Sequence, residues 1–436
     1  MAEIFPFRGV LYNREKIKNL EEVVAPPYDV ISCEEQEALY EKSPHNCIRL
    51  ILGKEYPEDD QENNRYARAA DCFRQWQEEG ILVRDERPAI YLYEQDYCLE
   101  DGRKKTLKGF ISLVRLADYE KGVVLPHETT FSKPTEDRLN LTRACSANFS
   151  SIFGLYSDVH DEINQVLDSK RDKPLIDITT DDRITHRLTR IVDEGSIERI
   201  AAAMKDKQII IADGHHRYKT ALRFRNEMRQ KFGLKGPEAF NHTMMFLVNI
   251  HDPGLTVLPA HRVVRNIDPL SIPDLEKNIG RYFELEKFKE KEKMFERLKI
   301  CGRTDHAFGM SVKGSRDYYL MILRDGLEFE RMVDIDMSQD WKRLDATVLH
   351  ILFIDHVLHI GREKVKKQQV EIDYVKDREK ALKMVDTGDC QMALFMNPTK
   401  ILQVERIAQN REKMPQKSTY FYPKPLSGLV KNRIDL

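Results

Sequence analysis

One stretch of the chain places a carboxylate, a glycine, two imidazoles and a guanidinium directly after one another: Asp213, Gly214, His215, His216 and Arg217. The β-branched residues 209–211 precede this stretch, and residues 218–228 after it carry apolar side chains at helical spacing. The pattern predicts a strand, a tight turn at the glycine, and the start of a helix.

Such a corner is suited to bind an anion. The first backbone N–H groups of a helix have no partner within it and lie at the positive end of its dipole. Gly214 lets a ligand approach the backbone, and Asp213 could cap the helix or help to bind Mg²⁺ through water. His215, His216 and Arg217 add donors and positive charge. The alternative is a capped helix whose histidines are solvated, or buried and hydrogen-bonded.

Residues 125–150 form a second stretch with reactive side chains. Two prolines interrupt it and it has no clear period, so we expect a long loop, which is either functional or simply solvated. The ionisable side chains of this stretch include His127, Glu128, Lys133, Arg138 and Arg143.

A further carboxylate lies near the N-terminus. The adjacent prolines at positions 26 and 27 cannot continue a helix, so Tyr28 and Asp29 are expected on a fixed loop. The alternative is a proline-stiffened lead into the next helix.

Strand and helix patterns alternate along the chain, which predicts a mixed α/β (α+β) fold. Ser32 and Glu35 form a capping box, so a helix is expected over residues 33–42. The expected strands include residues 47–52, 89–97, 105–116 and 243–250. Of these, residues 89–97 and 105–116 form a hairpin, and residues 243–250 are central in a sheet.

A chain of 436 residues is longer than one core usually supports. The glycine- and proline-containing stretch 233–237 is the best candidate boundary. We expect an N-terminal α/β domain, residues 1–235, that carries the motif, and a C-terminal α/β domain, residues 236–436. The second domain is either independent or completes the sheet of the first.

Composition excludes several classes of protein. The net charge of −2 and the pI near 6.7 give no general attraction to nucleic acid or to an anionic membrane surface. Seven scattered cysteines without a C-x-x-C pair argue for a reducing cytoplasm. Neither a leader peptide nor a membrane span is evident, so we expect a cytoplasmic protein. His350, His356 and His359 are expected in the core, because no third metal ligand has suitable spacing. The oligomeric state stays open.

Six blocks of the sequence resemble, in order, the signature blocks of a prokaryotic family catalogued as a domain of unknown function, the ten-fifteen family. They are Phe5–Gly9, Pro27–Ile31, His127–Leu139, Ala212–Tyr218, Leu258–Arg262 and Met414–Tyr422. This resemblance covers nearly the whole chain, but the family name itself implies no chemistry.

A shorter resemblance does imply chemistry. Gly214, Arg217, Tyr218 and Ala221 resemble the phosphate motif of the superfamily that joins ParB-type partitioning nucleotidases, sulfiredoxin and the free serine kinases. It implies a ParB/sulfiredoxin-like strand–turn–helix phosphate site within a larger mixed-sheet protein. It also links the ten-fifteen family to ATP-dependent phosphorylation of free L-serine. The partitioning proteins carry an arginine pair where this chain has a histidine and an arginine, and no cysteine lies beside the motif as sulfiredoxin requires.

The first hypothesis is therefore a small-molecule kinase that transfers a phosphoryl group from ATP or ADP, with Mg²⁺, to the hydroxyl of a free amino acid such as L-serine. Glu128 beside His127 is the expected general base, with Asp29 in reserve. The phosphates would be held by the corner motif and by a lid that carries Lys133 and Arg138.

Two other hypotheses remain. One is a nucleotide- or phosphometabolite-binding regulatory protein without turnover. The other, a metal-dependent hydrolase, fits less well, because the adjacent His215 and His216 cannot easily bind one metal ion from one helix face.

Overall fold

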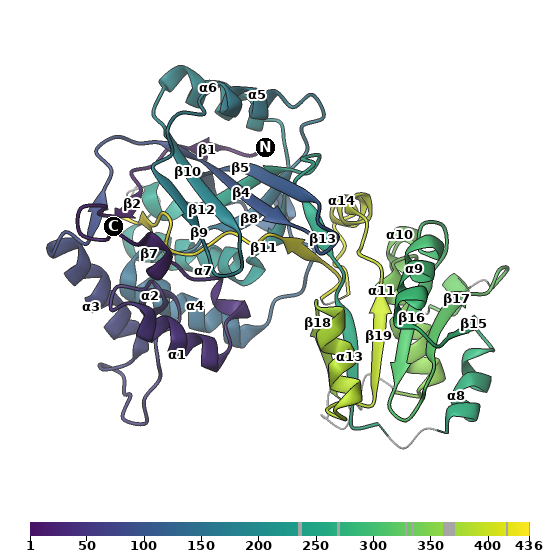
Figure 1. The fold of residues 1–436 in the computed structure, drawn as a ribbon. Helices are drawn as coiled ribbons and strands as arrows, with labels where there is room; N and C mark the ends of the chain where they lie inside the picture. The colour runs from purple at the N-terminus through teal and green to yellow at the C-terminus, as the bar shows by residue number, and fades with distance from the viewer. Residues whose placement is uncertain are drawn as a thin grey trace. The chain divides into compact units, whose positions relative to one another are not determined.

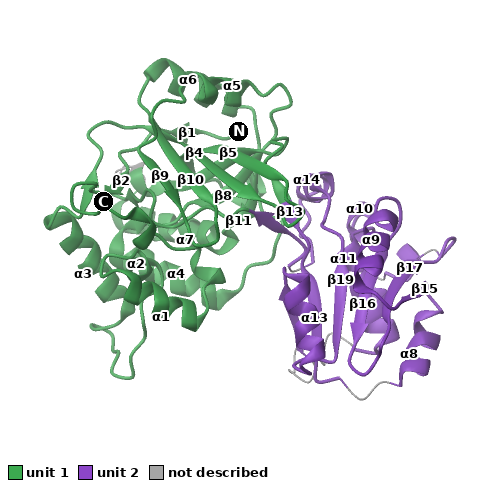
Figure 2. Ribbon diagram, in the orientation of Figure 1, with its two compact units in different colours: residues 1–256, 423–436 green, residues 257–422 purple. Residues whose placement is uncertain are grey.

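The computed structural model describes residues 1–233, 238–267, 271–327, 329–333, 335–360, 371–415 and 417–435. The chain forms two compact units, one from residues 1–256 and 423–436 and the other from residues 257–422 (Figure 2). The predicted mixed α/β class is confirmed. The division into residues 1–235 and 236–436 stays a prediction about domains, and residues 234–237 of its boundary lie outside the described residues.

The first unit is built on a large mixed sheet (Figure 1). Its strand order is β6-β11-β8-β12-β5-β4-β10-β9, and β1 pairs with β5. The strands are β1 (Ile4–Phe5), β4 (Ile90–Cys98), β5 (Lys104–Arg115), β6 (Val124–Leu125), β8 (Ile152–Tyr156), β9 (Ile176–Thr179), β10 (Thr185–Ile191), β11 (Ile209–Asp213) and β12 (His242–Asn249). The strand that leads to the motif, β11, is parallel to β6 and antiparallel to β8.

Helices lie on both sides of this sheet. In Figure 1, α5 and α6 are above it, while α1 to α4 are below. The helices of the first unit are α1 (Cys33–Lys42), α2 (Ile48–Ile51), α3 (Arg65–Glu78), α4 (Ser132–Cys145), α5 (Glu162–Asp168), α6 (Glu194–Met204) and α7 (His215–Phe232). The capping box predicted from Ser32 and Glu35 is present, and α1 has the predicted bounds. Short strand pairs join β2 (Val10–Tyr12) to β3 (Leu82–Arg84) and β7 (Ala147–Asn148) to β21 (Asn432–Arg433).

The core of the first unit lies around β12, as its apolar sequence predicts. This strand has β8 on one side and β5 on the other, and every residue from Thr243 to Asn249 is buried. The predicted hairpin is also present, because β4 and β5 pair in antiparallel register from Tyr91–Ile111 to Cys98–Lys104. The β11–α7 corner is connected to this core through β8, which lies between β11 and β12 in the sheet.

Two predicted elements are wrong. Residues 47–52 do not form a strand, because the Asn46 side chain accepts from the N–H of Ile48 and the apolar run continues as the short helix α2. Residues 132–145 are not a loop but the helix α4. Pro134 is the third residue of α4, where a backbone N–H has no partner within the helix, so a proline is tolerated.

The second unit has its own six-stranded sheet of order β15-β17-β16-β19-β14-β18. The strands are β14 (His261–Arg265), β15 (Phe283–Phe288), β16 (Ala307–Val312), β17 (Tyr318–Leu323), β18 (Glu371–Val375) and β19 (Met392–Met396), while β13 (Thr256–Leu258) pairs with β20 (Tyr420–Tyr422). The helices are α8 (Ile272–Ile279), α9 (Lys291–Cys301), α10 (Gln339–Lys342), α11 (Asp345–Val348), the π-helical η6 (Leu349–Val357), α13 (Arg378–Asp386) and α14 (Ile401–Gln409). None of the helices among the described residues has the length and apolar character needed to cross a membrane.

The histidines predicted to lie in the core of the second unit do not. His356 and His359 are exposed, and His350 is half-buried, although the neighbouring Leu349, Leu352 and Phe353 are buried. The apolar face of η6 is thus formed by its aliphatic and aromatic residues, and the imidazoles lie at its edge. Within the described ranges, no group of three or more histidine, cysteine, aspartate or glutamate side chains could hold a metal ion.

We predict that Gly154→Ala in β8 lowers the free energy of unfolding of the first unit by about 1–3 kcal/mol, because a Cβ there would overpack the core. It would lie 2.8 Å from Ile209 and 2.9 Å from Leu247. The matched control is Gly195→Ala in α6, whose Cβ would meet only Asp193 Oδ2 at 3.9 Å. This control should raise the free energy of unfolding by about 0.5–1 kcal/mol, because alanine favours a helix more than glycine does. Urea unfolding is followed by Trp76 fluorescence in a Trp341→Phe background; equal effects of the two substitutions would contradict the packing described.

Candidate functional site

The predicted strand–turn–helix corner is present in the first unit. β11 ends at Asp213, Gly214 has a φ of +93°, and α7 begins at His215. This backbone conformation is one that side chains with a Cβ rarely adopt, which explains the glycine. A Cβ at Gly214 would also lie 2.9 Å from the guanidinium of Arg217, so that group rests directly against the turn. Among the described residues, no side chain caps the N-terminus of α7.

Asp213 lies between two cations. Its Oδ2 accepts a hydrogen bond from Arg217 Nη2 at 2.6 Å, and its Oδ1 accepts one from Lys424 Nζ at 2.6 Å. Burial raises the pKa of Asp213, but the charges of Lys424 and then of Arg217 outweigh this and lower the pKa to about 2. The carboxylate is therefore ionised at neutral pH. It binds side chains on both sides instead of capping the helix.

Arg217 is held at two points and keeps a free donor. Besides Asp213, its Nη1 donates to the backbone oxygen of Ser151. Its Nε is buried and has no hydrogen-bond partner in the part of the chain that the structure describes. A buried donor without a partner costs free energy, so an acceptor that reaches this nitrogen would be favoured.

Lys424 belongs to the first unit although it follows the second in sequence. Besides the bond to Asp213, its ammonium lies 3.3 Å from Oδ2 of Asp29, in the turn η2 (Tyr28–Val30). The predicted reserve base is thus brought to the corner by a lysine that sequence reasoning missed. Its signal in the sequence is weak, because a lysine between Pro423 and Pro425 has neither periodicity nor a motif of its own.

His127, Glu128 and His215 lie together on the other side of the corner. Nε2 of His215 accepts a hydrogen bond from the backbone N–H of His127 at 3.3 Å. Burial lowers the pKa of His215 well below its usual value, so the ring is neutral and carries its proton on Nδ1. This Nδ1 lies 3.9 Å from Glu128 Oε2. The predicted base is thus next to the first residue of α7.

His216 holds the same loop at a second point. Its Nε2 accepts a hydrogen bond from the backbone N–H of Phe131 at 3.0 Å. Both histidines therefore accept a hydrogen bond at Nε2 from the loop between β6 and α4. The sequence had instead suggested that they donate hydrogen bonds to phosphate. The physical reason is that a neutral imidazole with one nitrogen occupied by an N–H cannot add positive charge.

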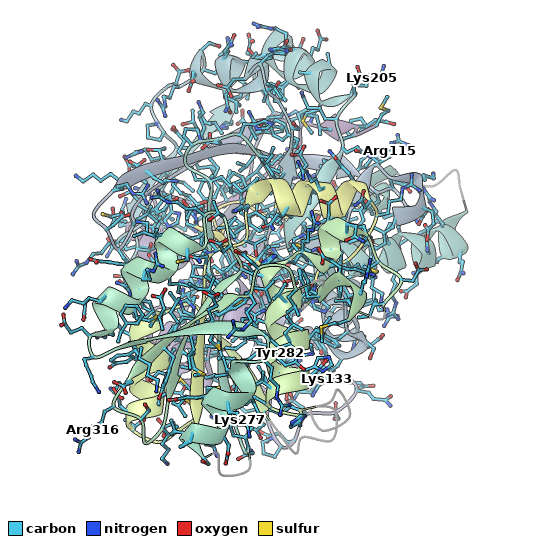
Figure 3. The ribbon with its side chains drawn as sticks, turned by 90° about the vertical axis from the view of Figure 1, so that its right-hand side faces the viewer. Arg115, Lys133, Lys205, Lys277, Tyr282 and Arg316 are labelled. Atoms are coloured by element: carbon cyan, nitrogen blue, oxygen red, sulfur yellow. The ribbon has the colours of Figure 1, made fainter. Side chains whose placement is uncertain are left out.

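The two cations of the predicted lid occupy different surroundings. Lys133, labelled in Figure 3, is exposed in the first turn of α4. Arg138 is 7% exposed, donates to the carbonyl of Ile51 and to Asp137, and lies 4.1 Å over the ring of Tyr28. Because α4 packs on α3 and α7, Arg138 belongs to a fixed helix and not to a mobile loop.

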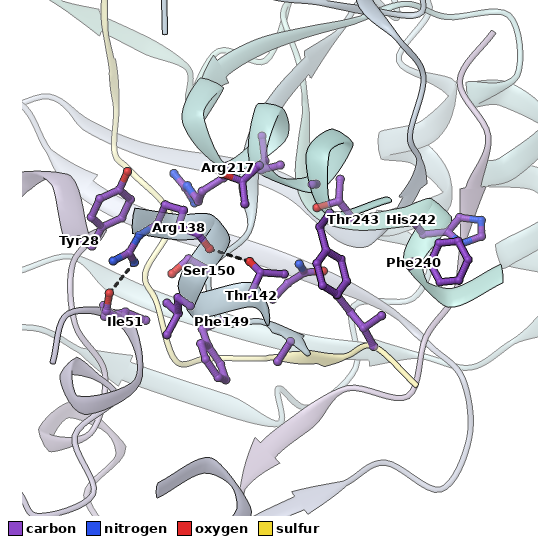
Figure 4. Close-up of a pocket in the computed structure, with 18 residues that line it drawn as sticks. Tyr28, Ile51, Arg138, Thr142, Phe149, Ser150, Arg217, Phe240, His242 and Thr243 are labelled. Atoms are coloured by element: carbon purple, nitrogen blue, oxygen red, sulfur yellow. Dashed lines mark hydrogen bonds between the residues drawn. The ribbon is translucent and has the colours of Figure 1, made fainter. Parts of the chain in front are cut away.

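A cavity of about 60 Å³ lies where α7 faces α4 (Figure 4). Tyr28, Arg138 and Arg217 lie at one end of it, and apolar side chains such as Phe240 line the other. One water molecule occupies about 30 Å³, whereas ligand sites measure about 300–1,000 Å³. The cavity therefore has room for water or a small group beside the two guanidiniums.

A family model described as "Protein of unknown function (DUF1015)" matches residues 4–347. The chain belongs to this family. The match includes most of the site, with Asp29, Glu128 and the β11–α7 corner, but it ends before Lys424. No curated protein matches this DUF1015 sequence.

Solved structures resemble the chain more distantly. A conserved hypothetical protein from Pyrococcus furiosus is 13% identical with a TM-score of 0.34, over 71% of this chain and 90% of that one. Free serine kinase in complex with AMP is 15% identical with a TM-score of 0.33, over 72% and 89%. A mutant of free serine kinase in complex with ADP is 13% identical with a TM-score of 0.35, over 72% and 89%. Similarities of this size do not determine an activity, so the function proposed below is based on the geometry of the site.

The burial of His127 has a consequence for pH dependence. Burial lowers its pKa to about 4, below the usual 6.5. Below pH 6.5 the imidazole of His127 binds a proton in the unfolded chain, whereas in the folded chain it does so only near pH 4. The free energy of unfolding therefore falls on acidification. We predict that His127→Gln reduces the loss of stability between pH 7 and 5 by about 2 kcal/mol. Urea unfolding with the Trp76 reporter measures this. His160→Gln, at an exposed histidine, should leave the difference unchanged; an equal effect would contradict the assignment to burial.

Proposed function

We propose that this chain is a small-molecule kinase that transfers the terminal phosphoryl group of ATP or ADP to the hydroxyl of a free amino acid, with L-serine as the first acceptor to test. The observation that carries the proposal is the corner between β11 and α7. There, an uncapped helix N-terminus, the guanidinium of Arg217 and the ammonium of Lys424 converge, with the carboxylate of Glu128 beside the first residue of the helix.

These groups match what phosphoryl transfer requires. The reaction needs positive charge on the phosphoryl oxygens, exact alignment, and one base near the acceptor hydroxyl. The backbone N–H groups after Gly214 and the free Nε of Arg217 supply donors on one side of the corner. His215 and His216 act differently from the direct phosphate ligands inferred from the sequence, since they hold the loop that carries Glu128 in place.

The proposed step is a direct transfer. The oxygen of the acceptor hydroxyl bonds to the terminal phosphorus while the bond from this phosphorus to the bridging oxygen breaks. The hydroxyl proton passes to the carboxylate of Glu128, and the bonding electron pair leaves with the nucleotide, as ADP from ATP or as AMP from ADP. Asp213 would help to hold Mg²⁺ through water, and the ion would supply positive charge to the phosphate oxygens.

The first test is whether a phosphorylated product forms. With ATP or ADP, Mg²⁺ and L-serine we expect phosphoserine, detected by mass spectrometry, and a panel of other hydroxyl-bearing metabolites sets the specificity. Arg217→Ala should weaken binding of the donor nucleotide by about tenfold or more, because one charge-assisted hydrogen bond contributes that much. The control is Arg223→Ala on the same helix, whose exposed ion pair with Glu136 contributes little. Nucleotide binding without any product would favour a regulatory protein.

The identity of the base is a separate prediction. We expect Glu128→Gln to lower kcat by about 10²–10⁴-fold, because a positioned base contributes this much, while the affinity for nucleotide changes little. Asp29→Asn should lower kcat by less than about tenfold, since Asp29 is paired with Lys424. Steady-state kinetics and titration calorimetry measure both. Near-normal turnover of Glu128→Gln would remove Glu128 from this role, and a large loss in Asp29→Asn would transfer the role to Asp29.

A further inference from the structure

We propose that Lys424 is the residue that binds the terminal phosphoryl group of the donor nucleotide, and that this group replaces Asp29 as a partner of the lysine. The inference rests on the function proposed above and extends it to a part of the chain that the family model does not cover. It assigns the C-terminal segment, residues 423–436, a direct part in the site.

The C-terminal segment is hydrogen-bonded to the N-terminal part of the first unit. Ser427 exchanges two backbone hydrogen bonds with Ala25, and Lys431 exchanges two with Val10. The Ala25 pairing lies just before the turn that carries Asp29. The segment therefore fixes the lysine and the loop with its carboxylate relative to one another.

The backbone at Lys424 is held in position by side chains of the large sheet of the first unit. The fully buried Gln95 of β4 donates from Nε2 to the carbonyl of Lys424 at 3.0 Å. Two residues further, the N–H of Leu426 donates to the hydroxyl of Tyr93 on the same strand at 3.3 Å. The backbone at Lys424 and at Leu426 is thus held by two buried side chains of β4, which restricts where the ammonium of Lys424 can lie.

The charges around Lys424 identify the partner that can be exchanged. Lys424 and Asp213 are both nearly buried, with side chains 12% and 13% exposed, and their atoms are 2.6 Å apart. Asp29 is 34% exposed and its oxygen is 3.3 Å from the ammonium, so this pair is longer and closer to solvent. Separating Lys424 from Asp213 would leave a buried charge unpaired, whereas Asp29 can turn to water. A phosphoryl oxygen would therefore replace Asp29 and leave Asp213 in place.

This arrangement makes a specific prediction about the nucleotide. A lysine that contacts the terminal phosphoryl group discriminates the donor from the product, which has one phosphate fewer. A lysine that only stabilises the corner would affect both nucleotides alike. The ratio of the two affinities therefore separates substrate contact from a structural role.

The test uses the full-length protein with ATP, ADP and AMP in separate calorimetric titrations. We expect Lys424→Met to weaken binding of the donor by about tenfold or more while binding of the product changes by less than about twofold. Lys424→Arg should retain most of the donor affinity, since it keeps the charge. The control is Lys207→Met, which removes another lysine with a largely buried side chain, 19% exposed and paired with Asp158 at 3.2 Å in the same unit, and which should leave the ratio unchanged.

Asp29→Asn supplies an independent test if Lys424→Met does not fold. Removing the competing carboxylate should strengthen binding of the donor by about twofold to tenfold without the same gain for the product. An unchanged ratio in both Lys424→Met and Asp29→Asn, or equal weakening of all three nucleotides, would overturn the inference. Formation of phosphoserine with an unchanged ratio would refute the role of Lys424 alone, whereas a changed ratio without any phosphorylated product would refute the kinase and keep the lysine contact.

Discussion

The site depends on one carboxylate that holds two cations. Asp213 binds Arg217 one helical turn along the chain and Lys424 from a position 211 residues away, and all three side chains are nearly buried. Buried charges are stable only when they are paired, so removal of Asp213 would leave the charges of both Arg217 and Lys424 without this partner. The pairing holds Arg217 against Gly214 and Lys424 beside Asp29. The carboxylate thereby organises positive charge at the corner.

The neutral histidines complete this arrangement from the other side. Because His127 and His215 are buried, they stay uncharged, and His215 and His216 accept hydrogen bonds from backbone N–H groups. They tie the loop after β6 to the first turn of α7. Glu128 is thus held beside the helix N-terminus by groups that carry no charge of their own. The positive charge of the corner then comes from the guanidinium, the ammonium and the helix dipole.

The path of the chain explains why the two ends meet at the site. The second unit, with its own sheet, occupies residues 257–422 between the two parts of the first. The chain then returns, and its last residues pair with residues 10 and 25 near the N-terminus and with β7. Asp29 and Lys424 therefore come from opposite ends of the sequence, and both depend on this C-terminal segment for their positions.

Several elements can be predicted from the sequence because their signals are local. The capping box of α1, the hairpin of β4 and β5, the buried strand β12 and the β11–Gly214–α7 corner all follow from spacing within a few residues. Local signals failed for residues 47–52, where a short apolar run fits a strand or a helix, and for α4, whose early proline resembled a loop. The pairing of Asp213 with Lys424 and the neutral state of His215 became visible only in the folded protein. Both result from burial and from contacts between distant segments, which leave no periodic trace along the chain.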